Sequence, residues 1–332
     1  MFKLKRFFLT LLTLSAALST GFMPSSYAAS QEDMVVWAQD LLANMVENGD
    51  INESFPAKVV PFLQYKARVI ELDKKQPENK ISFDTYRKRI LSEQRINTGR
   101  AKYKQHKVLL DEIAAKYNVQ PKYIIALWGI ETNYGGFTGG MQVLSSLATL
   151  AFEGRRTEFF TEEFKKAVKI AAKLHFPVTE MKGSWAGAMG QCQFMPSSYL
   201  AYAVDYDGDG DKDIWNTMPD VFASMANYLS SVGWDGDLRW GRAVKTPADF
   251  PLDLEGRKIK KTIEYWSDMH VTLPSGAALP KADNVLASII IPDKDGKDAF
   301  IVYNNYNTLM HWNRSTYFAT SVGLLADQIA GH

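Results

Sequence analysis

The chain has 332 residues, of which 46% are hydrophobic and 23% are charged, and this balance is ordinary for a soluble globular protein. Its formal charge of +1 argues against nucleic acid as a main partner. The single cysteine, Cys192, excludes an internal disulfide. We expect Cys192 to be a small buried residue, because a catalytic thiol needs a nearby histidine and none is evident.

The first 29 residues differ from the rest of the chain. Three basic residues precede an apolar run at 7–14, and small residues follow up to Ala28 and Ala29. This pattern predicts a secretory signal peptide cleaved after one of these alanines, whereas an uncleaved anchor would need a longer apolar run. No cysteine lies near the cleavage site, so we expect no lipid anchor. Loss of the three basic residues leaves a mature charge of −2, and we expect a soluble periplasmic protein.

The next part of the chain reads as mostly helical. Apolar spacing predicts helices over 31–48 and 109–117, while 51–80 indicates extended chain or short helix. Tyr86-Arg-Lys-Arg89, taken from composition alone, indicates a solvated basic face.

A strongly apolar helix is predicted to begin near Pro121 and to carry a carboxylic acid near its end. Ile124, Leu127, Trp128 and Glu131 follow the spacing i, i+3, i+4 and i+7 of one helix face. Burial on that face and the negative end of the helix dipole both raise the pKa of a carboxyl group. A carboxylic acid that stays neutral near pH 7 suits general acid catalysis. The alternative is that Glu131 rotates outward or caps a backbone group.

Residues 183–199 combine glycines and small residues with Ser184, Gln191 and Gln193. Such a run allows the backbone to approach a ligand or another segment closely. It does not match G-x-S-x-G, so a serine-hydrolase site is not indicated. Helices are predicted on both sides of it, over 145–152, 161–174 and 222–229.

The segment 205–216 resembles a calcium loop of the EF-hand type. Carboxylates occupy loop positions 1, 3 and 5, and Gly210 occupies position 6. Position 12 is Asn216 instead of the usual glutamate, and Asp220 is a candidate for the missing carboxylate. The alternative is an Asp/Gly-rich surface turn. Because there is one such loop, a structural clamp is favoured over a calcium sensor.

The C-terminal part is predicted to hold a β-hairpin and a final helix. Residues 285–291 and 299–303 are the expected strands, with a turn at Asp295-Gly296. The last helix is expected over 316–329.

Four motifs in this order resemble the B-type lytic murein transglycosylases, from about Val36 to the C-terminus. They are Trp128-Gly-Ile-Glu-Thr-Asn-Tyr-Gly135, Gly183-Ser-Trp-Ala-Gly-Ala-Met-Gly190, Gln193-Phe-Met-Pro-Ser-Ser-Tyr199 and the Asp205 loop. The resemblance implies a mainly α (α+β) fold, with a lysozyme-like core, an N-terminal helical region and a small β subdomain. The expected regions are 1–29 (signal peptide), 30–108 (N-terminal helices), 109–240 (catalytic core), 241–303 (β subdomain) and 304–332 (return to the core).

The resemblance also implies roles for individual residues. Glu131 matches the family's single acid/base, Ser184 the serine that contacts the sugar N-acetyl group, and Gln193 its substrate glutamine. Further matches are Tyr86, Tyr228 and Asn313 in the glycan cleft, Arg156 near the peptide stem, and Asp205, Asp207, Asp209 and Asp211 at calcium. Asp220 matches the last calcium ligand only if one residue is inserted here. Trp312 stands where the family often has tyrosine, which implies an altered subsite.

The implied reaction cleaves the β-1,4 bond between N-acetylmuramic acid and N-acetylglucosamine in peptidoglycan. Glycosidases ordinarily use two carboxylates, but no second acid occurs between Glu131 and Glu153. We therefore expect the substrate's acetamido group to assist Glu131 and a 1,6-anhydro end to form. Two alternatives are a hydrolytic lysozyme on the same fold and a non-catalytic, calcium-clamped wall-binding protein. Structural Ca²⁺ is expected without an organic cofactor, in a monomer that binds glycan strands and not nucleic acid, with cell-wall synthesis or remodelling proteins as further candidate partners.

Overall fold

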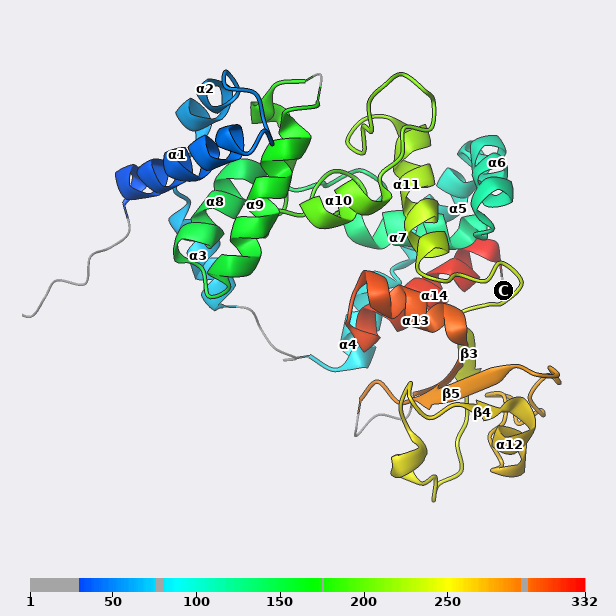
Figure 1. Ribbon diagram of the computed structural model, residues 1–332. Helices are drawn as coiled ribbons and strands as arrows, with labels where there is room; N and C mark the ends of the chain where they lie inside the picture. The colour runs from blue at the N-terminus through cyan, green and yellow to red at the C-terminus, as the bar shows by residue number, and fades with distance from the viewer. Residues whose placement is uncertain (1–29, 76–80, 175, 294–297, 332) are drawn as a thin grey trace, which may run out of the picture.

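The computed structural model describes residues 30–75, 81–174, 176–293 and 298–331. The predicted signal peptide and the turn at Asp295-Gly296 lie outside these ranges. The described chain is rich in helices and carries a small sheet at one end (Figure 1). None of its helices combines the length and the apolar character needed to cross a membrane.

One lobe is formed by helices from two separate parts of the sequence (Figure 1). Its elements are α1 (Gln31–Glu47), α2 (Pro56–Val59), η1 (Val60–Phe62), α3 (Ala67–Lys74), α8 (Val143–Glu153) and α9 (Thr157–Ala171). Helix α8 lies in the middle, packed against α1, α3 and α9. It is apolar almost all round, which suits a helix covered by neighbours on several sides.

The second group of helices surrounds α7 (Pro121–Thr132). It comprises α4 (Phe83–Ile90), α5 (Glu93–Gln105), α6 (Lys107–Tyr117), α10 (Pro196–Tyr202), α11 (Met218–Ser231), α13 (Asn304–Trp312) and α14 (Thr316–Ala330). Helix α7 begins with a proline, where the missing N–H costs nothing, and ends at Asn133 in the left-handed conformation. It packs against α5, α6, α11 and α14, so its side chains are buried along most of its length.

A four-stranded antiparallel sheet lies next to this group (Figure 1). Its strands are β3 (Gly241–Val244), β4 (Lys261–Thr262), β5 (Leu286–Ile290) and β6 (Ala299–Val302), in the order β3-β6-β5-β4. With η3 (Leu252–Leu254) and α12 (Ile263–Asp268), the sheet encloses a second hydrophobic cluster around Trp266, Ile289 and Ile301. A separate pair, β1 (Met141–Gln142) and β2 (Lys182–Gly183), lies after α7, and η2 (Val178–Glu180) precedes β2.

The structure bears out the predicted long helices and the predicted hairpin strands. Strands β5 and β6 pair antiparallel with Ile289 opposite Ile301. Within 51–80 the described residues form short helices joined by short non-helical segments. The interpretation of 86–89 as only a basic face was incomplete, because these residues lie within α4, and the following helix α5 was not foreseen. Cys192 is fully buried and unpaired, as expected.

Candidate active site

Glu131 lies in the last turn of α7, where protein surrounds it on most sides while part of the residue stays accessible. Its Oε1 accepts a hydrogen bond of 2.7 Å from Trp312 Nε1. Burial raises the pKa of Glu131 to about 7, and the Trp312 donor acts in the opposite direction because it stabilises the ionised form. Near neutral pH the carboxyl group is therefore divided between its two protonation states, which allows it to donate a proton and to accept one.

The segment 183–199 is fastened to α7 through Gln191. Its Oε1 accepts from Trp128 Nε1 at 2.8 Å, and its Nε2 donates to the Trp215 carbonyl at 2.8 Å. Thr132 Oγ1 also donates to the Gln191 carbonyl oxygen at 3.4 Å. The glycine-rich segment is thus held beside the helix end that carries Glu131.

The turn after α7 is fixed by Tyr134. Asn133 and Tyr134 both adopt positive φ, at 51° and 59°, and the Tyr134 hydroxyl donates to the Arg95 carbonyl at 2.8 Å. The ring lies so close to Gly129 that a Cβ there would come within 2.6 Å of it. A glycine in this helix therefore lets the turn fold back on α7, two residues from Glu131.

Ser184 follows β2 directly, and its hydroxyl oxygen accepts two backbone N–H groups. The donors are Ala188 N at 3.0 Å and Ala186 N at 3.3 Å. A serine hydroxyl has two acceptor lone pairs and one proton. Since both lone pairs are occupied, the proton of Ser184 remains to be donated to an acceptor such as a carbonyl oxygen.

Gln193 offers a free hydrogen-bond acceptor, whereas Ser184 offers a free donor. Its backbone has φ 50°, and its Nε2 donates to the carbonyls of Thr138 and Gly190, both at 2.9 Å. Both amide protons are thereby used. Within the described part of the chain Oε1 has no hydrogen-bond partner, so it is an acceptor available to a ligand hydroxyl or amide.

Trp312 is held in place by an aromatic group. Its ring centroid lies 4.6 Å from that of Tyr228 and 5.3 Å from that of Phe194. The Tyr228 hydroxyl lies 2.9 Å from His311 Nδ1 and donates to the His311 carbonyl at 3.0 Å. Burial raises the pKa of Tyr228 to about 12. The structure therefore shows Tyr228 supporting Trp312, with its hydroxyl engaged by α13.

Tyr86 and Asn313 are the other two residues predicted to line the glycan cleft. Tyr86, on α4, is half-buried, and burial and then the charge of Glu131 raise its pKa, so its hydroxyl is within electrostatic reach of that carboxylate. Asn313 is exposed directly after Trp312, and its Oδ1 accepts Ser315 N at 3.1 Å. The Asn313 amide N–H groups have no partner among the described residues.

Arg156 lies apart from these residues, at the start of α9 in the turn after α8. Its guanidinium carbon is 5.3 Å from the ring centroid of Phe159 and 4.9 Å from that of Phe160. These rings account for its contacts within the described residues. Within the described residues, no hydrogen bond or ion pair connects Arg156 with Glu131 or Ser184.

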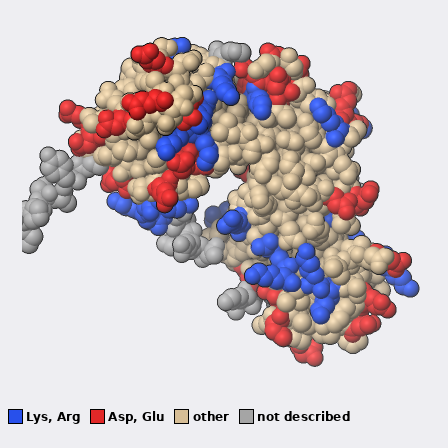
Figure 2. Space-filling view, in the orientation of Figure 1, with Lys and Arg blue, Asp and Glu red and all other residues tan. Residues whose placement is uncertain are grey.

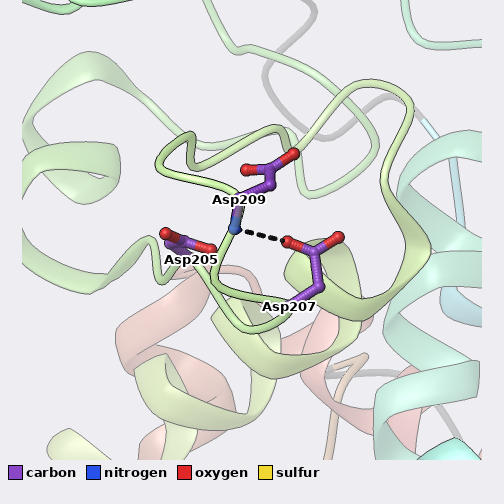
Figure 3. A group of neighbouring side chains, drawn as sticks. All are labelled: Asp205, Asp207 and Asp209. Atoms are coloured by element: carbon purple, nitrogen blue, oxygen red, sulfur yellow. Dashed lines mark hydrogen bonds between the residues drawn. The ribbon is translucent and has the colours of Figure 1, made fainter.

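Figure 3 shows the three aspartates of the loop before α11 that gather as a candidate cation site. One carboxylate oxygen from each of Asp205, Asp207 and Asp209 lies within 4.8 Å of the others. Gly210 has φ +99°, the conformation that the tight turn needs. Hard oxygen donors at alternate positions suit calcium. The residues present therefore fit the ion at three of its five predicted ligands.

The two other predicted ligands, Asp211 and Asp220, are not among the three aspartates whose carboxylates gather. Asp220 is fully buried beside the loop, where its Oδ1 accepts Tyr206 N at 2.7 Å and its Oδ2 accepts Asp213 N at 2.8 Å. Burial raises its pKa to about 6, while the two backbone donors oppose that shift. Asp220 thus braces the loop. Asp211, through its backbone N–H, donates to Asp209 Oδ1 at 2.8 Å.

Helix α7 ends where the chain crosses to α8 in the other lobe, and Figure 2 shows a hollow between that lobe and the rest of the molecule. Two functional contacts were not foreseen from sequence: the Trp312 donor to Glu131 and the Gln191 brace. The only sequence signal for the first was the unusual residue before Asn313.

A family model for the transglycosylase SLT domain matches residues 33–327. The membrane-bound lytic murein transglycosylase B of Escherichia coli K12 is 33% identical over 248 residues, which are 74% of this chain and 66% of that protein, just under two thirds of its length.

Solved structures give the same result. SltB3 from Pseudomonas aeruginosa, in complex with NAG-anhNAM-pentapeptide, is 37% identical with a TM-score of 0.86, over 90% of this chain and 80% of its own. The Escherichia coli lytic transglycosylase Slt35 in complex with calcium is 29% identical with a TM-score of 0.76, over 88% and 92%. The fold is therefore that of the lysozyme-like lytic transglycosylases. The chain belongs to the transglycosylase SLT domain family, in which the lytic murein transglycosylases are enzymes that act on peptidoglycan.

Proposed function

We propose that this chain cleaves the β-1,4 bond between N-acetylmuramic acid and N-acetylglucosamine in peptidoglycan and leaves 1,6-anhydromuramic acid ends. The observation that carries the proposal is the setting of Glu131. Its pKa is raised to about 7 by burial, and Trp312 holds one of its oxygens. A single carboxyl group in this state serves as the acid in one step and the base in the next.

The absence of a second carboxylate at the site supports assistance from the substrate. Within the described residues, no other acidic side chain is near enough to contribute to the pKa shift of Glu131. Glycosidases that lack a second carboxylate can use the 2-acetamido oxygen of the sugar as the nucleophile. A hydrolytic lysozyme on this fold would need a carboxylate to activate water.

Two side chains have the free groups that such a mechanism requires. The Ser184 proton, left over after its oxygen accepts two backbone N–H groups, would orient the acetamido carbonyl. The free Oε1 of Gln193 would accept from a sugar hydroxyl or amide. We assign Tyr86 and Asn313 to the walls of the glycan cleft and Tyr228 to the support of Trp312. Arg156 remains a candidate contact for a peptide stem.

The reaction then runs in two balanced steps. Glu131 gives its proton to the glycosidic oxygen, the bond from C1 to that oxygen breaks, and the acetamido oxygen bonds to C1 as an oxazolinium ion. The Glu131 carboxylate next takes the proton of the C6 hydroxyl, O6 attacks C1, and the oxazolinium ring opens. Glu131 ends protonated, as it began, and no water is consumed.

We further propose that residues 109–240 form the catalytic core, and that the Asp205 loop binds calcium as a structural clamp. When bound, the ion would neutralise the clustered carboxylates, with Asp205, Asp207 and Asp209 as ligands and Asp211 and Asp220 as candidates. Three carboxylate oxygens that converge without a cation nearby repel one another. The N-terminal pattern supports export and a soluble periplasmic location, with glycan strands as the partner.

Mass spectrometry of digested sacculi tests the reaction. We expect anhydromuramic ends from the unaltered protein, whereas hydrated muramic ends would show a lysozyme. Glu131→Gln should keep glycan binding and abolish cleavage. If the unaltered, folded protein fails to lyse purified murein but still binds it, the non-catalytic wall-binding alternative is correct.

A further inference from the structure

A cavity lined by both polar and apolar residues lies at the junction of the sheet and α13, and Glu131 is not among its lining residues. Its volume is about 410 Å³. Leu286 and Val302 from the sheet are among its lining residues. The polar lining residues that matter here are Asp235, Asp237, Arg257, Lys260, Asn304 and Asn307. We call this cavity the Arg257 pocket.

The Arg257 pocket carries two cations and two carboxylates that do not neutralise one another. Within the described residues, none of Asp235, Asp237, Arg257 and Lys260 takes part in an ion pair. Arg257 Nη1 donates to the neutral Asn307 Oδ1 at 3.2 Å. Charges of both signs are thus available in one cavity. A ligand that offers a carboxylate and an ammonium group would satisfy both sets, whereas a ligand with one charge would meet repulsion from one of them.

Helix α13 connects this pocket to the catalytic carboxyl group. Asn304 and Asn307 lie at the start of α13, and Trp312, its last residue, donates to Glu131. The nine residues of α13 span roughly 13 Å at a rise of about 1.5 Å per residue.

Three accessible side chains of α13 lie on one face of the helix. Asn304, Asn307 and His311 are spaced i, i+3 and i+7, which places them on one face of a helix, and each keeps some exposure. All three offer polar groups: Asn304 Nδ2 donates to the Gly233 carbonyl at 3.3 Å, Asn307 Oδ1 accepts from Arg257, and His311 Nδ1 faces Tyr228. A polar stripe therefore leads from the Arg257 pocket towards the Glu131–Trp312 contact.

We propose that the Arg257 pocket binds the free end of a peptide stem whose sugar occupies the catalytic site. The inference rests on the proposed function, because it takes peptidoglycan as the substrate. An extended peptide spans about 3.3–3.6 Å per residue, so four or five residues cover the length of α13. The terminal carboxylate would face Arg257 and Lys260, and a free amine of the stem would face Asp235 and Asp237. Figure 2 shows Lys and Arg side chains gathered on the part of the molecule that contains the sheet.

The kinetic test compares glycan strands that carry pentapeptide with strands from which an amidase has removed it. The double variant Arg257→Gln/Lys260→Gln removes the two cations of the pocket, and Lys258→Gln, the control, removes one positive charge from an exposed neighbour outside it. We expect the KM for peptide-bearing strands, relative to stripped strands, to rise about three- to tenfold in the double variant and to stay unchanged in Lys258→Gln. An unchanged ratio in the double variant would overturn the inference.

A binding test isolates the carboxylate. A pentapeptide without sugar and its C-terminal amide are titrated against Glu131→Gln and against the same chain with the Arg257→Gln/Lys260→Gln change. Amidation should weaken binding about threefold or more in the first protein and have no effect in the second. If amidation weakened binding equally in both proteins, the peptide carboxylate would not lie against Arg257 and Lys260. Failure of the proposed function would look different, because the unaltered enzyme would then produce no anhydro ends from either kind of strand.

Discussion

Trp312 donates its indole N–H to Glu131 Oε1 at 2.7 Å, although 181 positions separate the two residues in the chain. The indole can donate but cannot accept. Oε1 is therefore held as an acceptor, and the proton of the neutral acid belongs on Oε2. The contact fixes which oxygen of Glu131 can carry the transferable proton, and it moderates the effect of burial on the pKa of Glu131.

Replacement of Trp312 by phenylalanine should move the pH profile of cleavage. The ring still packs against Tyr228, but the donor that stabilises the Glu131 carboxylate is lost, so the pKa of Glu131 rises. Activity of a general acid falls above its pKa, and we expect the alkaline limb of kcat/KM to move up by about one pH unit. Trp37→Phe, in the other lobe, is the control. An alkaline limb that does not move would show that the contact leaves the acid unaffected.

The raised pKa of Glu131 should also appear in the stability of the protein. Its folded pKa of about 7 exceeds the ordinary value of 4.5, so the folded state binds the proton more tightly than the unfolded state. The stabilisation is complete below pH 4.5 and is lost as the pH rises through 7. Between pH 5 and pH 8 we expect the unaltered protein to lose about 2 kcal/mol more unfolding free energy than Glu131→Gln, because partial exposure reduces the full shift. Urea unfolding at both pH values measures the difference, and parallel losses would refute it.

Calcium should stabilise the chain through the Asp205 loop. An ion that binds the folded state alone raises the melting temperature, by roughly 5 °C at 100 times its dissociation constant for a chain of this size. Asp209→Asn should reduce the shift, and Asp253→Asn, an exposed acid in the β part, should not. Scanning calorimetry with calcium and with a chelator gives the comparison. The clamp would be excluded if calcium raised the melting temperature of Asp209→Asn and of the unaltered protein equally.

Gly129 should tolerate no side chain. A Cβ at this position would lie 2.6 Å from the Tyr134 ring, so alanine must displace the turn after α7. We expect Gly129→Ala to lower the unfolding free energy by about 1–3 kcal/mol and to reduce kcat. Gly140→Ala is the matched control, since nothing lies within 4 Å of its Cβ. Equal stability of the two variants would mean that Tyr134 does not depend on this contact.

The sequence pattern predicted the elements whose stability is local. Helix α7 has a strong apolar stripe, a proline start and a turn signal at its end, and β5 and β6 are rich in β-branched residues. Helix α5 gave no such signal, because within it only Gly99 is buried. Helix α5 packs against α7 and α14, and Gly99 lies close to the Tyr134 hydroxyl; these contacts depend on the tertiary fold. The N-cap serines Ser82 and Ser92 were the available clues to α4 and α5.

The candidate site also contains some features that the sequence predicts and others that only the structure shows. Glu131 follows from periodicity and elementary electrostatics, whereas Ser184 and Gln193 were assigned through the resemblance to a family. The free proton of Ser184 and the free oxygen of Gln193 are visible only in the structure, because they depend on which backbone groups occupy the remaining positions. The Trp312 contact joins distant parts of the chain, and no local pattern encodes it.

Cys192 sits between Gln191 and Gln193, fully enclosed, and burial raises the pKa of its thiol well above the usual range. As the sole sulfhydryl of the molecule, it gives the protein a built-in reporter. An alkylating reagent can reach it only when the segment around Cys192 opens, so the rate of labelling measures how often this segment separates from the end of helix α7.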